Sequence, residues 1–92
     1  MPRFYFHVCD GTDFIEDEEG RDLADVATAC SEAVKGARSI MADDLQRGQL
    51  DLSSFIEVED ERDELLFTLT FSEAVDLKPD AEKPLHFRKR LN

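Results

Sequence analysis

The chain has 92 residues, of which 41% are hydrophobic and 36% are charged, and this length and apolar content predict one folded domain with a single small core. The net charge of −11 is unevenly divided: residues 1–77 hold six Lys and Arg against 20 Asp and Glu, a net charge of −14, whereas residues 78–92 hold five against two, a net charge of +3. An acidic body repels phosphate backbones, which argues against nucleic acid and favours a basic protein partner.

The first elements form a predicted hairpin. Aromatic and apolar residues alternate with polar ones over residues 3–9, which is the pattern of a half-buried strand. Asp10-Gly11-Thr12 predicts the turn, and residues 13–16 predict a short second strand. We expect another turn at residues 18–20, after which Leu23 enters the core.

Residues 25–47 predict one long helix, because their apolar side chains recur at i, i+3, i+4 and i+7. We expect Asp22 or Asp25 to cap its start, Gly48 to cap its end, and Gly36 to mark a close approach to the sheet. The apolar face comprises Val26, Cys30, Ala33, Val34, Ala37, Ile40, Met41 and Leu45. Asp43 and Asp44 lie where the helix dipole disfavours negative charge, which makes this end a candidate contact site.

A second hairpin is predicted after a loop at residues 49–53, with strands at residues 55–59 and 65–71 joined by a charged turn. Residues 72–76 are expected to add a helical turn. We expect residues 1–77 to form the domain and residues 78–92 to form a basic, flexible C-terminal tail. The alternatives for this tail are contact with a membrane surface, with a nucleic acid or with an acidic groove, of which the nearest is on the body of its own chain or of a dimer mate, where the tail would form a clasp.

The predicted fold is α+β, with the order ββαββ and the helix packed on one face of an antiparallel sheet. The side chains expected to face the helix are Phe4, Phe6, Val8, Ile56, Val58, Leu65, Phe67, Leu69 and Phe71.

The face of the sheet without a helix is the candidate interaction face. Its predicted residues are Tyr5, His7, Phe55, Glu57, Leu66, Thr68 and Thr70, with Cys9 beside them. Aromatic and apolar side chains among polar ones are typical of protein interfaces, so we expect a non-enzymatic interaction or regulatory module that forms a homodimer or binds a basic partner. The simpler alternative is an ordinary solvated surface.

Tyr5, His7 and Glu57 also suggest a small-molecule or metal-binding site with modest catalysis, because a histidine near a carboxylate can transfer protons. No nucleophile, phosphate loop or paired cysteine ligands accompany them, so no catalytic residue and no cofactor is predicted. The carboxylates of residues 10–20 do not fit the spacing of an EF-hand loop, and solvated turns explain them more simply.

The sequence shows no secretory leader and no apolar stretch of about 20 residues, so we expect a cytoplasmic protein without membrane contact. Cys9 and Cys30 lack metal-site spacing. In the cytoplasm they are expected to be buried or half-buried free thiols.

The chain resembles a bacterial family of small proteins, common in alphaproteobacteria, that is known only as a domain of unknown function. The resemblance covers about residues 1–75. It is carried by Met1-Pro2-Arg3-Phe4-Tyr5-Phe6, Asp10-Gly11, Asp17-Glu18-Glu19-Gly20, Leu23, Ala24-Asp25, Ile56-Glu57-Val58 and Leu69-Thr70-Phe71. It implies the same element order in a bacterial cytoplasmic protein, and it implies no activity, substrate or catalytic residue.

Overall fold

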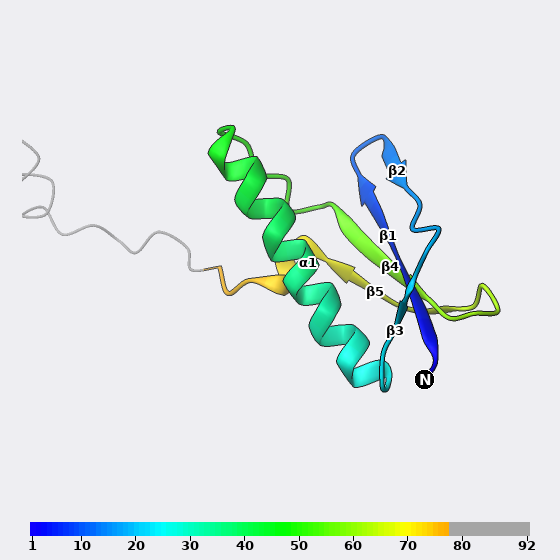
Figure 1. Cartoon of the computed structure of the whole chain (residues 1–92). Coiled ribbons are helices and arrows are strands. Elements are labelled where there is room, and N and C mark those ends of the chain that lie inside the picture. Colours follow the sequence, from blue (N-terminus) through cyan, green and yellow to red (C-terminus); the bar gives the residue numbers. More distant parts are fainter. Residues whose placement is uncertain (78–92) are drawn as a thin grey trace, which may run out of the picture.

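Strand β1 (Arg3–Asp10) is the centre of the sheet. In the computed structural model, which describes residues 1–77, β1 pairs antiparallel with β4 (Phe55–Glu59) along one edge. Along its other edge it pairs with β2 (Asp13–Ile15) at one end and with β3 (Arg21–Asp22) at the other. Strand β5 (Leu65–Thr70) pairs with β4, so the strand order is β2-β1-β4-β5 with β3 beside β1 (Figure 1). The expected α+β fold and its order are therefore confirmed, with β3 as an additional strand.

The turn between β1 and β2 has the expected position. Asp10 pairs with Asp13, which leaves a two-residue loop of Gly11 and Thr12. Gly11 adopts a φ of +62°, a conformation that glycine takes without the steric cost of a Cβ atom.

Helix α1 (Val26–Gln46) lies across one face of the sheet (Figure 1). Asp25 caps its start, because its carboxylate accepts a hydrogen bond from the Thr28 backbone N–H at 2.8 Å. Gly48, with a φ of +82°, follows its end as expected. Arg21 of β3 adds a tie to the helix, because it pairs with Glu32 at 2.8 Å while its guanidinium lies 4.6 Å from the centre of the Phe6 ring.

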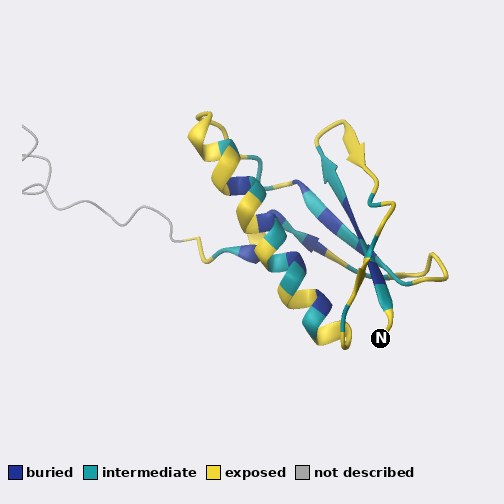
Figure 2. Cartoon of the chain, in the orientation of Figure 1, coloured by how far each residue is buried: buried dark blue, intermediate teal, exposed yellow. Residues whose placement is uncertain are grey.

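The buried face of α1 agrees with the expected one only in part. Ala33, Ala37 and Met41 of the expected face are buried together with Ala29, and Val34 and Ile40 are partly buried, whereas Val26, Cys30 and Leu45 are exposed. Figure 2 shows buried, intermediate and exposed positions following one another along the helix. Small residues at every fourth position let the helix axis approach the sheet closely, and this turns the larger side chains toward the flanks. Gly36 was expected to be required by this close approach, and that expectation is wrong. A Cβ atom built there would lie 3.8 Å from Ile56 Cδ1, which is an ordinary van der Waals distance.

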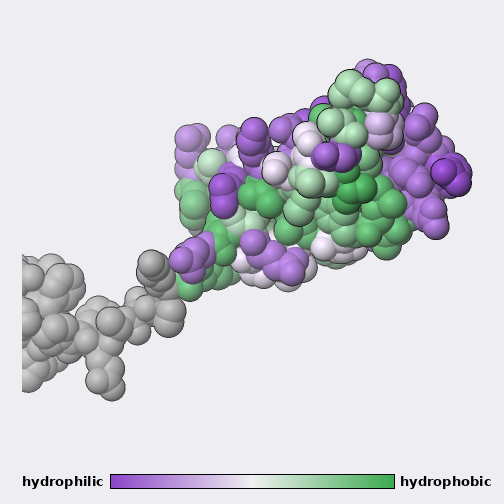
Figure 3. Space-filling view, turned by 90° about the horizontal axis from the view of Figure 1, so that it is seen from below, coloured by the Kyte–Doolittle hydropathy of each residue, from purple (hydrophilic) through white to green (hydrophobic). Residues whose placement is uncertain are grey.

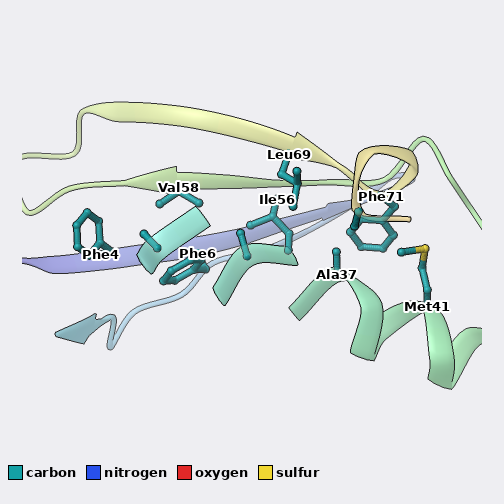
Figure 4. Packing of buried hydrophobic residues seen from close by; sticks show 11 residues of the cluster. Phe4, Phe6, Ala37, Met41, Ile56, Val58, Leu69 and Phe71 are labelled. Atoms are coloured by element: carbon teal, nitrogen blue, oxygen red, sulfur yellow. The ribbon is translucent and has the colours of Figure 1, made fainter. Parts of the chain in front are cut away.

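The core lies between the sheet and α1 (Figure 4). Of the residues expected there, Phe4, Phe6, Ile56, Val58, Leu69 and Phe71 are buried, and Val8 and Phe67 are partly buried and pack against the cluster. Leu23 also packs against the core, as expected. The 3₁₀ helix η1 (Phe71–Ala74) supplies Phe71 and Ala74, and the Arg38 side chain of α1 donates to the Ala74 carbonyl at 2.6 Å.

Leu65 and Leu66 are placed opposite to expectation. Leu65 is 51% exposed and pairs with Glu59, whereas Leu66 is partly buried and packs against the core. The register between β4 and β5 shifts at Val58 and Glu59, so that one extra residue of β5 is accommodated there. Such a bulge breaks the strict alternation of sides on which the expectation depended.

No helix in residues 1–77 is long and apolar enough to cross a membrane. The flexible tail expected at residues 78–92 lies outside the described residues.

Candidate interaction face

The sheet face opposite α1 brings most of the predicted interaction residues together. The register places Glu57 of β4 between His7 of β1 and Thr68 of β5, and Phe55 between Cys9 and Thr70. Tyr5 lies further along β1, opposite Glu59. Tyr5, Phe55, Glu57 and Thr70 are half-buried and Thr68 is exposed, so these five side chains form one connected and partly accessible surface.

Phe14 also belongs to this surface, although the sequence analysis did not include it. It pairs with Cys9 across the first hairpin, and its side chain is 57% exposed. The two-residue turn could have located it, because such a turn fixes the register and sets residue 14 opposite residue 9. Leu65, more than half exposed, takes the place at the β5 edge that was expected for Leu66.

His7 is buried rather than displayed, with only 5% of its surface exposed. Its Nε2 lies 3.1 Å from Glu59 Oε1, its Nδ1 accepts the Asp17 backbone N–H at 3.0 Å, and its ring centre lies 5.6 Å from that of Phe14. Because Nδ1 is an acceptor, the proton is on Nε2 and is donated to Glu59. The expected carboxylate partner, Glu57, is the cross-strand neighbour, but Glu59 makes the contact.

Asp17 completes the outer edge of β1 in the gap between β2 and β3. Its Oδ2 accepts the backbone N–H of Phe6 at 3.0 Å, and its Oδ1 accepts those of Glu19 at 3.2 Å and Gly20 at 3.1 Å. Burial alone would raise the pKa of this carboxyl group. The three backbone hydrogen bonds outweigh burial and hold the pKa of Asp17 below its ordinary value.

Gly20 allows this loop to lie against β1. It has a φ of +71°, and a Cβ atom there would come within 2.8 Å of Tyr5 Cε2, 2.9 Å of Arg3 Cγ and 3.0 Å of the Phe4 carbonyl oxygen. The sequence Asp17-Glu18-Glu19-Gly20 is therefore a structural loop that holds β1 and positions His7. Residues 1–77 contain no group of three or more His, Cys, Asp or Glu side chains arranged to hold a metal ion.

The two cysteines differ in their surroundings. Cys9 is half-buried, as expected, and burial, followed by the charge of Glu57, raises the pKa of its thiol. Little of it is therefore thiolate near neutral pH. Cys30 is exposed on α1, which corrects the expectation of burial.

One side of the domain carries a broad apolar area (Figure 3). Figure 3 views the side on which the N-terminus and the start of α1 lie in Figure 1, and it shows a broad hydrophobic area bordered by hydrophilic residues. Apolar areas with polar borders are typical of interaction surfaces.

Comparison with known proteins identifies the family but not a function. No curated protein and no solved structure matches the chain. The model of the family described as Domain of unknown function (DUF6894) matches residues 3–72, which include β1 to β5 and α1. The chain therefore belongs to the DUF6894 family.

Proposed function

We propose that this protein is a non-enzymatic interaction module that binds a basic protein partner through the sheet face opposite α1. The observation that carries the proposal is the Glu57 carboxylate. It lies half-buried in the middle of this face, opposite His7 and Thr68, and it accepts no hydrogen bond from residues 1–77.

The surroundings of Glu57 suit a Lys or Arg side chain. Tyr5, Phe14 and Phe55 supply aromatic surface, on which a guanidinium group can lie while it pairs with a carboxylate. The net charge of −14 on residues 1–77 would steer a basic partner toward the domain.

The same charges bear on the expected homodimer. If two copies joined through this face, Glu57 and Glu59 of one copy would approach those of the other while the face lost its contact with water. Like charges that are buried together are unfavourable. We therefore favour a basic partner over self-association, and the homodimer remains a prediction to be tested beside it.

The chemistry of the buried groups supports a non-enzymatic role. Both ring nitrogens of His7 are engaged, one by Glu59 and one by the Asp17 backbone, so neither is directed at a substrate. The raised pKa of Cys9 disfavours its thiolate.

The test compares Glu57→Arg with Glu64→Arg, which makes the same change of charge in the exposed turn between β4 and β5. The tagged wild type and each tagged variant are incubated with native, nuclease-treated cell extract, and the bound proteins are identified by mass spectrometry. The binding of each identified protein to the wild type and to the two variants is then measured with purified components. We expect a stoichiometric partner with a Lys- or Arg-rich contact segment, retained by the wild type and Glu64→Arg and lost by Glu57→Arg.

Light scattering on the same proteins separates the alternatives. Equal retention by both variants would show that the open face is not the binding site. A defined oligomer that Glu57→Arg disrupts, with no other protein bound, would replace the basic partner with a second copy.

A further inference from the structure

A second surface lies on the opposite side of the molecule, along the C-terminal half of α1. It is a groove of about 260 Å³ between the helix, the loop that precedes β4 and the last described residues. Its apolar lining includes Met41, Leu45, Leu50, Leu52, Val75 and Leu77. Leu45 is 58% exposed, Leu50 is 41% exposed and Leu77 is 54% exposed, so three leucines open to solvent meet in one groove.

One end of this groove is acidic. Leu50 also lines a neighbouring hollow that contains Asp10, Asp44 and Asp51. The C-terminus of α1 adds the partial negative charge of the helix dipole, and no basic residue lies in its last turn. Arg47, just beyond the helix, contacts Asp44 at 2.6 Å. Arg38, which also lines the groove, donates to the Ala74 carbonyl. At the acidic end itself three carboxylates surround the single Arg47, so this end still favours additional cations.

The chain itself contains a segment of matching chemistry. Residues 85–91 read Leu-His-Phe-Arg-Lys-Arg-Leu, with apolar side chains for the groove and three adjacent cations for its acidic end. We infer that this segment folds back and occupies the groove of its own chain.

The connection is long enough. Leu77 already lines the groove, and the seven residues 78–84 that follow can span up to about 24 Å when extended. The stretch of α1 from Arg38 to Leu45 is about 10 Å long at 1.5 Å per residue. Figure 1 shows residues 75–77 beside the helix, where the connection begins. The family match covers residues 3–72, so residues 85–91 lie outside the matched domain.

A spin label at the end of the full-length chain tests this inference. The nitroxide is attached to Asn92→Cys in a protein that also carries Cys9→Ser and Cys30→Ser, so that only one cysteine is labelled. Methyl signals are recorded by NMR with the nitroxide in its oxidised (paramagnetic) state and again after the nitroxide is reduced. We expect selective loss of the signals of Leu45, Leu50 and Leu52 in the oxidised state. The loss should shrink when Arg88, Lys89 and Arg90 are replaced by Gln, and remain when Arg62, in the exposed turn, is replaced by Gln instead.

A mixed sample distinguishes the chain's own tail from that of a neighbour. Isotopically enriched protein without a label is combined with unenriched, spin-labelled protein, and the clasp within one chain predicts no signal loss. Loss in the mixed sample would assign the groove to a second copy. In the first sample, where the enriched chain itself carries the spin label, signal loss at other methyl groups or no signal loss at all would also overturn the inference. Amide hydrogen exchange on the unlabelled protein gives an independent measure, with faster exchange expected in residues 44–52 when Phe87 is replaced by Ser.

Discussion

Replacement of Gly20 by alanine tests how the outer edge of β1 is completed. The substitution adds one methyl group at a residue with a φ of +71°, within 2.8 Å of Tyr5 Cε2, 2.9 Å of Arg3 Cγ and 3.0 Å of the Phe4 carbonyl oxygen. The arginine side chain can move aside. The carbonyl oxygen cannot, because it is part of the backbone of the central strand, so the loop itself must shift.

The expected loss has two parts. A left-handed backbone conformation costs a residue with a Cβ atom roughly 1–2 kcal/mol, and an overpacked contact costs about 1–3 kcal/mol more. The free energy of unfolding should therefore fall by roughly 2–5 kcal/mol, against about 5–15 kcal/mol for a whole domain. For a domain of this size, each 1 kcal/mol lowers Tm by about 4–8 °C.

Two other glycines provide matched controls for urea unfolding. Gly11 has a φ of +62° and nothing within 4 Å of a built Cβ, so Gly11→Ala should show the backbone cost alone, roughly 1–2 kcal/mol. Gly36 lies inside α1 with 3.8 Å of clearance to Ile56 Cδ1, so Gly36→Ala should stabilise the protein by about 0.5–1 kcal/mol. If Gly20→Ala costs no more than Gly11→Ala, the packing of this loop against β1 is wrong.

Three further predictions concern charge, strain and ligands. The pKa of Asp17 is depressed in the folded protein, so its stabilisation is present above the unfolded pKa of about 3.9 and is lost as the pH falls through the folded value. The urea midpoint of Asp17→Asn should therefore fall less steeply than that of the wild type between about pH 5 and pH 2, and equal slopes would contradict the role of this carboxylate. Asp63 has a φ of +62°, so Asp63→Gly should raise the free energy of unfolding by up to about 1 kcal/mol in the same assay, whereas a decrease would show that its side chain compensates for the strain. Divalent metals and common metabolites should leave Tm unchanged, because both ring nitrogens of His7 are engaged; a shift that His7→Gln removes would revive the small-ligand hypothesis.

Sequence periodicity located the parts of the fold in which local pattern and tertiary packing agree. Alternation placed Phe6 and Val58 in the core because both belong to regularly paired strands. The cap at Asp25 was predictable because its hydrogen bond is local, to a backbone group three residues away.

The rest depends on contacts that a local pattern does not contain. The register shift opposite Glu59 exchanged the expected environments of Leu65 and Leu66. The two-residue strand β3 is too short to show a period, and it forms where the loop ending at Gly20 meets β1. His7 was assigned to the correct face, but its burial comes from Phe14, Glu59 and the Asp17 backbone, which are distant in sequence.

The acidic residues of the domain are of two kinds, which the structure distinguishes. Many carboxylates stabilise the fold locally: Asp25 caps α1, Asp51 and Asp60 accept bonds within their turns, and Glu73 accepts the Thr70 N–H. Hydrogen bonds lower the pKa of each of these groups, so their charge is favoured by folding itself.

Glu57 is of the second kind, a carboxylate that does not stabilise the fold through a local hydrogen bond. No backbone or side-chain group of residues 1–77 donates a hydrogen bond to it, yet it lies half-buried in the middle of β4 between His7 and Thr68, where a solvated turn cannot explain its charge. A carboxylate held in such a place without a donor is free to bind one supplied from outside. Net charge alone does not distinguish these two kinds of acidic residue, and for this reason the proposed contact rests on one position in the sheet rather than on the acidity of the chain.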